Sequence, residues 1–162
     1  MKLNAQELIQ KLDLKPLPGE GGFFRETHRS KEMTNFRGGE ARSLATAIYY
    51  LITPTSFSAL HKLPVDETFH FYAGGTVEML LIRPQDQPKT VLLGNRLDKD
   101  EIPQITIPNG TWQGSRLLNG DFALMGTTVY PGFEFRDLEL ASEEMILSFP
   151  ESEKLIRKFL QR

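Results

Sequence analysis

The run HKLPVDETFHFYAGG, at residues 61–75, contains two histidines, the adjacent acids Asp66 and Glu67, and a closing pair of glycines. Imidazole and carboxylate groups bind divalent metals, and the same two groups serve as acid and base near neutral pH. The chain contains no cysteine, which excludes disulfides, thiolate nucleophiles and Cys-based zinc sites. Metal binding, proton transfer and plain packing are the alternatives for this run, and a metal site would need His, carboxylate or amide ligands.

The position of each side chain in this run follows from the strands around it. Residues 56–61 and 67–73 have the composition of strands, and Pro64 lies in the short turn between them. We predict that the two strands are neighbours and that His61 faces Glu67 across the pair. A carboxylate that points into a barrel core is costly unless it is paired or functional, so this pair is the first candidate for a pocket.

Alternation along the second strand separates the two histidines. Glu67 shares its face with Phe69 and Phe71, whereas His70 falls on the opposite face. His70 is equally compatible with contact to a ligand and with packing between strands or at an interface.

The chain between about residues 20 and 149 has the signals of β structure. Alternating or β-branched runs are separated by Gly, Pro, Asn and Asp, which predicts a barrel or sandwich of many short strands. The predicted strands lie near residues 23–28, 43–53, 56–61, 67–73, 76–83, 89–93, 104–107, 111–118, 121–130, 134–140 and 144–148.

Short helices are predicted at both ends of the chain. Asn4 and Glu7 have the spacing of a capping box, and the apolar residues after them predict a helix over residues 4–13. Near the other end, Pro150 suits a first helical turn. The apolar residues beyond it repeat at helical spacing, which predicts a helix on the outside of the barrel: Leu155, Ile156, Phe159 and Leu160.

Size and charge limit what the protein can be. With 162 residues, 40 % of them hydrophobic, the chain is predicted to form one domain over residues 1–162. A net charge of −2 with scattered basic residues argues against a nucleic-acid partner. No window approaches the roughly 20 apolar residues that cross a bilayer, and no signal peptide is evident, so we expect a cytoplasmic protein without a membrane partner. The segment 29–42, rich in Arg, Lys, Gly and Glu, is predicted to be a mobile loop that could act as a lid.

The spacing of these residues resembles the two motifs of the cupin superfamily. His61, Leu63 and Glu67 fall on the first motif, HxH followed by E and then G, and PNGTWQ at 108–113 falls on the second. The stretches DETFHFYAGG, IPNGTWQG and YPGFEFRDLELA, with GGFFRETHRS near the start, are similar to the small cupin_5 or DUF985 group over about residues 8–149. The resemblance implies an all-β double-stranded β-helix, the cupin jelly-roll barrel, usually a homodimer, with a small-molecule pocket in the barrel mouth.

The sequence departs from the metal-binding form of these motifs at two positions. Leu63 stands in place of the second histidine of HxH, and Gln113 stands in place of the histidine of the second motif. A metal-binding cupin holds its ion with three His and one Glu, so His61, Glu67 and Gln113 would form only a weak and unselective site. We predict no cofactor, with a weak divalent-metal site at these three residues as the alternative.

A second resemblance bears on acid/base chemistry. GGFFRET is similar to the RGFFxE strand of dTDP-sugar 3,5-epimerases, which are metal-free cupins that use a His base to abstract a proton beside a carbonyl. By this resemblance His61 would be the catalytic base, with Glu67 orienting it and Gln113 holding the substrate oxygen. The pyrophosphate of such a substrate needs Arg or Lys in the mouth, and the candidates are not placed by any motif: Arg25, Arg42 and Arg116.

The remaining site candidates come from the later strands. Ser115 shares the inward face of Gln113, and both are predicted to contact the ligand, as are His61 and Glu67. In the run at 130–137, Tyr130 is a candidate general acid and Glu134 a candidate ligand contact.

Three functions remain open for this constellation. The first is a metal-free isomerase or epimerase that acts on a small carbonyl or sugar-like substrate. The second is a binding or sensor protein that returns its small-molecule ligand unchanged. The third, a metal-dependent cupin enzyme, requires a ligand set that the chain mostly lacks.

Overall fold

The computed structural model describes residues 4–161, so residues 1–3 and 162 of the predicted domain lie outside it. Its strands are β1 (Lys15–Pro16), β2 (Phe23–Arg29), β3 (Met33–Phe36), β4 (Glu40–Ser43), β5 (Thr46–Ile52), β6 (Ser58–Lys62), β7 (Asp66–Gly74), β8 (Val77–Ile82), β9 (Lys89–Leu93), β10 (Gln104–Ile107), β11 (Trp112–Leu117), β12 (Ala123–Tyr130) and β13 (Glu139–Leu140). Its helices are α1 (Ala5–Lys11), α2 (Glu144–Ser148) and α3 (Glu153–Ile156), with single 3₁₀ turns η1 (Arg37–Gly39), η2 (Leu97–Lys99), η3 (Phe135–Asp137) and η4 (Pro150–Ser152).

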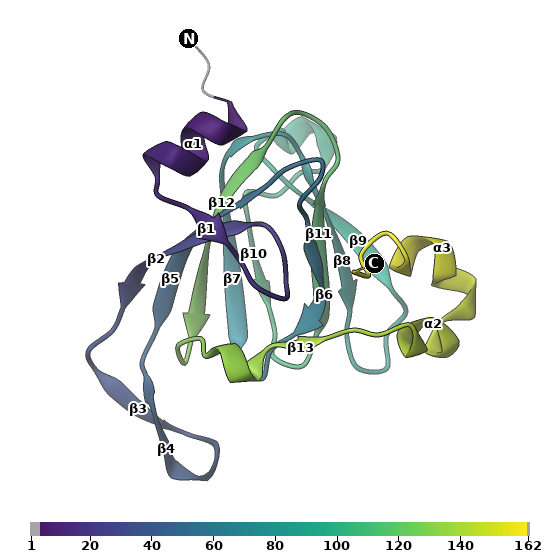
Figure 1. The fold of residues 1–162 in the computed structure, drawn as a ribbon. Helices are drawn as coiled ribbons and strands as arrows, with labels where there is room; N and C mark the ends of the chain where they lie inside the picture. Colours follow the sequence, from purple (N-terminus) through teal and green to yellow (C-terminus); the bar gives the residue numbers. More distant parts are fainter. Residues whose placement is uncertain (1–3, 162) are drawn as a thin grey trace.

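Two antiparallel sheets face each other and form the barrel (Figure 1). The larger sheet has the strand order β1-β2-β5-β12-β7-β10, and the smaller has the order β13-β6-β11-β8-β9. From β5 to β8, and again from β9 to β13, successive strands alternate between the two sheets, so β6 lies in one sheet and β7 in the other. The predicted all-β jelly-roll barrel with short terminal helices is confirmed.

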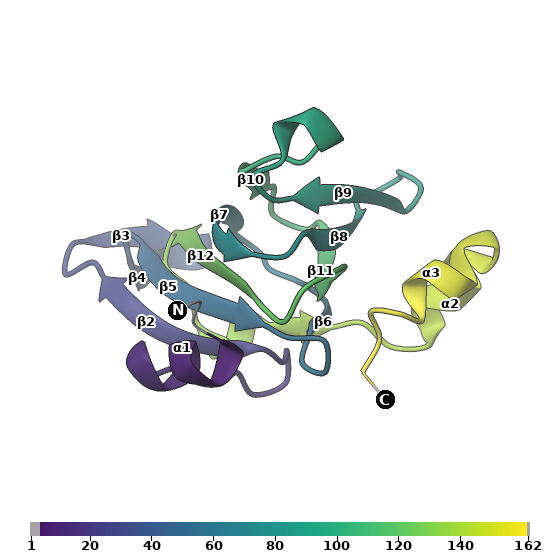
Figure 2. The same cartoon turned by 90° about the horizontal axis from the view of Figure 1, so that it is seen from above.

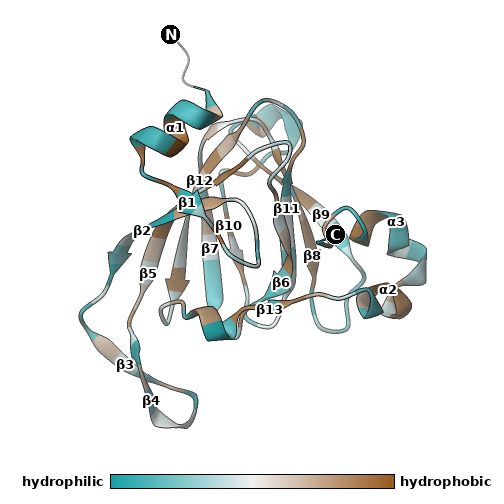
Figure 3. Ribbon diagram, viewed as in Figure 1, coloured by the Kyte–Doolittle hydropathy of each residue, from teal (hydrophilic) through white to brown (hydrophobic). Residues whose placement is uncertain are grey.

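The core lies between the two sheets because each contributes one apolar face to it. The side chains at alternate positions of β8 point inward and meet those of β5, β7 and β12. Hydrophobic residues, drawn brown, occur along β5, β8 and β12 (Figure 3). The buried members of this core are Leu17, Tyr50, Ile52, Phe69, Val77, Met79, Leu81, Leu93, Ile107, Ala123 and Met125.

The terminal helices cover the outer faces of the barrel on opposite sides (Figure 2). The predicted capping box is present, since Asn4 and Glu7 exchange hydrogen bonds at the start of α1, and Leu8 packs on Leu51 of β5. At the other end Ile156 and Phe159 are fully buried against the smaller sheet, as predicted, although the helix α3 ends at Ile156 and Phe159 lies in the turn that follows. No helix within residues 4–161 is long and apolar enough to cross a membrane.

The segment 29–42 was expected to be a loop, and most of it is instead the antiparallel hairpin β3–β4, which extends beyond the barrel (Figure 1). The turn of this hairpin contains Gly38 and Gly39, both with positive φ, which glycine adopts at no steric cost. Arg42, at its base, is buried and bound to Asp137, which ties the hairpin to the η3 turn.

Two of the predicted strands are wrong. In the segment 134–140 only β13 is a strand, because turn hydrogen bonds over η3 replace a sheet ladder before it. The segment 144–148 is the helix α2: the hydroxyl of Ser142 accepts from the backbone N–H of Glu144, and a helix lets Ile146 become buried while Leu147 stays 81 % exposed. A short apolar run has no period that distinguishes a strand from a helix of this length.

Candidate functional site

His61 lies on β6 with its imidazole buried in the barrel, where it is 1 % exposed. Its Nδ1 is 2.7 Å from the carbonyl oxygen of Ala59, and a carbonyl can only accept, so Nδ1 carries a hydrogen. The other ring nitrogen, Nε2, faces a carboxyl oxygen of Glu20 at 3.8 Å, which is ion-pair distance. The proton that His61 can gain or lose therefore lies on the side of Glu20.

Glu20 reaches this position from the turn that precedes β2, and the residue is 8 % exposed. The hydroxyl of Ser58 donates to its Oε1 at 2.6 Å. The turn approaches β6 so closely that a Cβ on Gly21, which has φ of 99°, would lie 2.3 Å from the backbone oxygen of Phe57. Sequence reasoning missed Glu20; its one signal is an acid inside the glycine-rich run GEGG, which no motif marks.

Glu67 lies on β7 and is 7 % exposed. The amide nitrogen of Gln113 donates to its Oε2 at 2.7 Å. Burial, and then the nearby charge of Glu20, raise the pKa of Glu67 from 4.5 to about 7, although the charge of His61 and hydrogen bonds from Thr127 and Gln113 act in the opposite direction. Glu67 is thus a carboxyl group that can hold or release a proton near neutral pH.

His61 and Glu67 approach each other across the barrel rather than along one sheet. The prediction that strands 56–61 and 67–73 pair through a tight turn is wrong, because β6 pairs with β11 and β13 while β7 pairs with β10 and β12. Gln113 on β11 is the direct cross-strand partner of His61, and its amide spans the barrel to Glu67. The three residues are brought together by the facing of the two sheets.

A cavity of about 60 Å³ opens beside this cluster. Glu20 and Glu67 are its buried carboxyl groups, and Thr46 and Thr127 add buried hydroxyl groups. His61, Gln113 and Ser115 are not part of the lining; His61 faces Glu20 and Gln113 bonds to Glu67. Since a water molecule needs roughly 10–15 Å³ of such volume, the cavity accommodates on the order of five water-sized groups. The lining residues are Leu17, Glu20, Phe24, Glu26, Arg29, Thr46, Ile48, Tyr50, Leu63, Glu67, Phe69, Thr127, Val129, Phe133 and Phe135.

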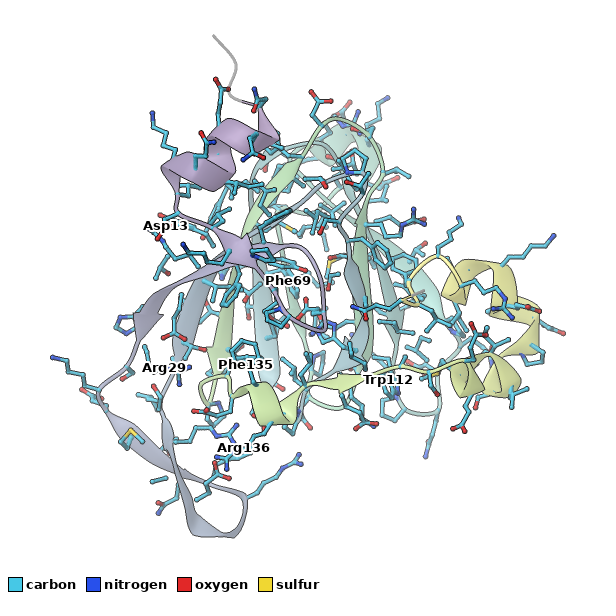
Figure 4. The ribbon with its side chains drawn as sticks, in the orientation of Figure 1. Asp13, Arg29, Phe69, Trp112, Phe135 and Arg136 are labelled. Atoms are coloured by element: carbon cyan, nitrogen blue, oxygen red, sulfur yellow. The ribbon has the colours of Figure 1, made fainter. Side chains whose placement is uncertain are left out.

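The outer end of the cavity is formed by exposed aromatic and charged side chains. Arg29 and Phe135 lie toward the β3–β4 end of the barrel, whereas Phe69 lies farther inside (Figure 4). Arg29 forms ion pairs with Glu26 at 2.9 Å and with Glu134 at 3.2 Å, and these bonds, the one to Glu26 first, raise its pKa above the ordinary value. Glu134, a predicted ligand contact, is thus placed at this end through Arg29.

The three arginines proposed as phosphate contacts lie elsewhere. The side chain of Arg42 is buried against Asp137, Arg25 lies over the ring of Tyr49, and Arg116 lies 5.6 Å from the ring of Phe57. The arginine that lines the cavity is Arg29. It lies in the GGFFRETHRS stretch, but it was not predicted from the sequence as a site residue.

The other predicted site residues are placed away from the cavity lining. His70 is on the outer face of its sheet, within 3.3 Å of the side chains of Thr128 and Gln104. Tyr130 is 41 % exposed, and its hydroxyl is 3.2 Å from that of Thr68. Ser115 is buried, and its hydroxyl has no hydrogen-bond partner among residues 4–161.

The side chains present do not fit a cupin metal site. Leu63 lies at the cavity wall and packs with Val65 and Val129, so it offers no ligand. The amide nitrogen of Gln113 points at Glu67, which uses the donor end of that side chain. Within the described part of the chain, no group of three or more His, Asp or Glu side chains is arranged to hold an ion.

Comparison with known proteins identifies one family and one curated relative. The family model described as Cupin superfamily (DUF985), Cupin_5, matches residues 6–141. The Uncharacterized protein YML079W of Saccharomyces cerevisiae is 33 % identical over 133 residues, which cover 73 % of this chain and 66 % of the yeast protein, less than two thirds of its length.

Solved structures agree with this match. A hypothetical protein from Leishmania major is 32 % identical, with a TM-score of 0.90 over 99 % of this chain and 100 % of that one. A cupin 2 conserved barrel domain protein from Rhodopseudomonas palustris is 13 % identical, with a TM-score of 0.57 over 92 % and 90 % of the two chains, and shares the fold alone.

Proposed function

The chain belongs to the Cupin_5 (DUF985) family of the cupin superfamily, and from this premise we propose that its barrel cavity binds a small organic ligand of carbonyl or sugar-like chemistry. The observation that carries the proposal is the cavity itself, which joins apolar and aromatic walls to two buried carboxyl groups. Ligand sites in proteins have this composition, with a few convergent polar groups in an otherwise apolar hollow. Glu67 is the central contact, because it is buried and its pKa of about 7 is typical of functional carboxyls.

The volume favours a compact ligand. A cavity of about 60 Å³ does not enclose a nucleotide sugar, so the substrate class of the dTDP-sugar epimerases would have to remain largely outside the barrel. Neither Arg25 nor Arg116 lines the cavity to hold a pyrophosphate. A small sugar fragment or carbonyl compound is the better match.

Proton transfer is the second candidate function, favoured by the protonation of Glu67 near neutral pH. A protonated Glu67 donates to a ligand oxygen, and an ionised Glu67 accepts a proton from the ligand. His61 contributes behind the lining: a proton that passes between the cavity and its Nε2 goes by way of Glu20. A metal-free isomerase would use these groups, whereas a sensor would use the same groups to hold a ligand that it does not change.

The experiment is a metabolite thermal-shift screen on the purified protein, followed by mass spectrometry of the bound compound. We expect a small polar compound to stabilise the wild-type protein and to bind less tightly to Glu67→Gln. The matched control is Glu78→Gln, a carboxyl-to-amide change on the outer face of β8. If no small organic compound binds, or if Glu67→Gln binds as the wild type does, the proposal is wrong.

The screen also separates the two functions. A compound that is returned altered indicates an enzyme, and His61→Ala should then abolish turnover while the fold is kept. A compound that is returned unchanged indicates a binding or sensor protein. The homodimer implied by the family stays a prediction, which sedimentation of the purified protein tests directly.

A further inference from the structure

The lining of the cavity carries more acid than base. Glu20, Glu26 and Glu67 line it, and Arg29 is the one lining residue with a cationic side chain. Arg29 is already bound to Glu26 and to Glu134, so the guanidinium is neutralised where it stands. A ligand that enters the cavity thus meets a field of negative sign, which raises the local concentration of cations and repels anions.

At the buried end of the cavity, the hydrogen-bond acceptors that remain available outnumber the available donors. Four donors at this end are engaged: Tyr50 donates to the carbonyl oxygen of Gly21, Ser58 donates to Glu20, and Gln113 and Thr127 donate to Glu67. Each carboxylate has about four lone-pair sites, so Glu20 and Glu67 keep acceptor capacity after these bonds are made. Unused acceptors in a buried cavity are costly unless a ligand or water supplies the donors.

Glu20 keeps one carboxyl oxygen, Oε2, beyond hydrogen-bond distance of His61. Its Oε1 accepts from Ser58, and its Oε2 is the atom that faces Nε2 of His61 at 3.8 Å, beyond hydrogen-bond distance. An N–H or O–H group of a ligand that bonds to Oε2 completes the coordination of this carboxylate.

We propose that the cavity selects small ligands that are neutral or cationic and present hydroxyl or amine donors, and that Glu20 is the residue that determines this selectivity. The inference rests on the proposed function, because it assumes that the cavity binds a small molecule. It adds the chemical class of the ligand end that reaches the carboxyl groups, and it excludes carboxylate and phosphate at that end.

The test compares three small probes that differ in charge: ethanolamine, glycerol and lactate. Binding to the ¹⁵N-labelled protein is measured by titration, followed through the amide signals of Thr127 and Val129, which line the cavity. We expect the wild-type protein to bind ethanolamine most tightly, glycerol next and lactate least. Glu20→Gln should lose about tenfold in ethanolamine affinity, the loss expected when a charge-assisted hydrogen bond is replaced.

Two further variants separate selectivity from folding. Glu20→Asp keeps the charge and should keep the preference for ethanolamine over lactate, even where it weakens binding or stability. Glu78→Gln, on the outer face, should behave as the wild type does. The measured quantity is the ratio of ethanolamine affinity to lactate affinity on folded protein. A change in stability alone does not alter this ratio.

The outcomes are distinguishable from those of the proposed function. If lactate binds as tightly as ethanolamine, or if Glu20→Gln keeps the wild-type ratio, the inference is overturned. A carboxylate or phosphate compound recovered by the metabolite screen would keep the proposed function and overturn this inference. If neither the probes nor any metabolite bind, both are overturned.

Discussion

Replacing Glu67 by Gln should make the protein more stable at neutral and alkaline pH, although it removes a group that lies at the centre of the candidate site. Burial and the charge of Glu20 raise the pKa of Glu67 from 4.5 to about 7, so the folded protein holds this proton more tightly than the unfolded chain does. The cost of ionising the buried group is absent below pH 4.5, grows as the pH rises, and is complete above pH 7, where it reaches about 3 kcal/mol.

Glutamine has nearly the same shape and no charge to desolvate, and its amide oxygen can still accept from Gln113. The stability of Glu67→Gln relative to the wild type should therefore rise by about 3 kcal/mol between pH 4 and pH 8. For a chain of this size each kcal/mol moves the melting temperature by about 2–4 °C, so the difference grows by roughly 6–12 °C.

The assay is urea unfolding followed by circular dichroism across this pH range, with Glu78→Gln as the control for a carboxyl-to-amide change outside the barrel. The control should show a flat difference from the wild type. If the difference for Glu67→Gln is also flat, Glu67 is not protonated by its surroundings, and the electrostatic account of the cavity is wrong.

Three other changes test separate parts of the structure. Arg96 donates to Glu101 and lowers its pKa to about 2, so Glu101→Gln should melt below the wild type at neutral pH, with a deficit that shrinks as the pH falls from 4.5 to 2 in melting curves. The double variant Leu63→His, Gln113→His should bind Zn²⁺ stoichiometrically in calorimetry, with stabilisation of about 3 kcal/mol at a hundredfold excess over Kd; no gain over the wild type would show that the backbone does not aim these positions at one point. Phe159→Ala should cost about 3–5 kcal/mol in urea unfolding, because the ring is fully buried between the smaller sheet and the C-terminal helices.

Most of the barrel could be predicted because its strands follow local rules. The segments 89–93 and 104–107 are strands with those bounds, and β2 and β11 lie within a residue of the predicted limits. These strands alternate or are β-branched, and Gly, Pro or Asn separates them, so each is specified by its own residues. The hairpin β3–β4 and the helix α2 were missed because polar composition and a short apolar run do not distinguish the alternatives.

Which sheet a strand joins is a property of the whole chain. Pro64 correctly marks a short connection between β6 and β7, yet that connection crosses from one sheet to the other. The alternation of side chains along each strand correctly placed His61, Glu67 and Gln113 in the interior. The predicted pairing of the strands that carry His61 and Glu67 was wrong. Parity is local in sequence, whereas pairing depends on residues far away.

Glu20 could not be predicted from spacing, because its importance comes from contact with a strand almost forty residues further along the chain. The turn requires glycine at position 21 because its backbone lies against that of Phe57. The same close approach places Glu20 inside the barrel. Arg29 was missed for a similar reason, since its partner Glu134 lies 105 residues away.

The two positions where the chain departs from a metal-binding cupin explain the electrostatics of the cavity. A cation held beside Glu67 would stabilise the carboxylate and lower its pKa, as bound metal ions do for their ligands. With Leu63 at the wall and an amide at Gln113, burial is the largest influence on that carboxyl, and its pKa rises instead. The double histidine variant should therefore reverse the behaviour of Glu67 in the presence of Zn²⁺: the loss of stability between pH 5 and pH 8 should disappear when the metal is added. If the loss persists in a variant that binds Zn²⁺, then Glu67 is not the source of the pH dependence, and the acid that repels anions from this cavity must be Glu20 acting alone.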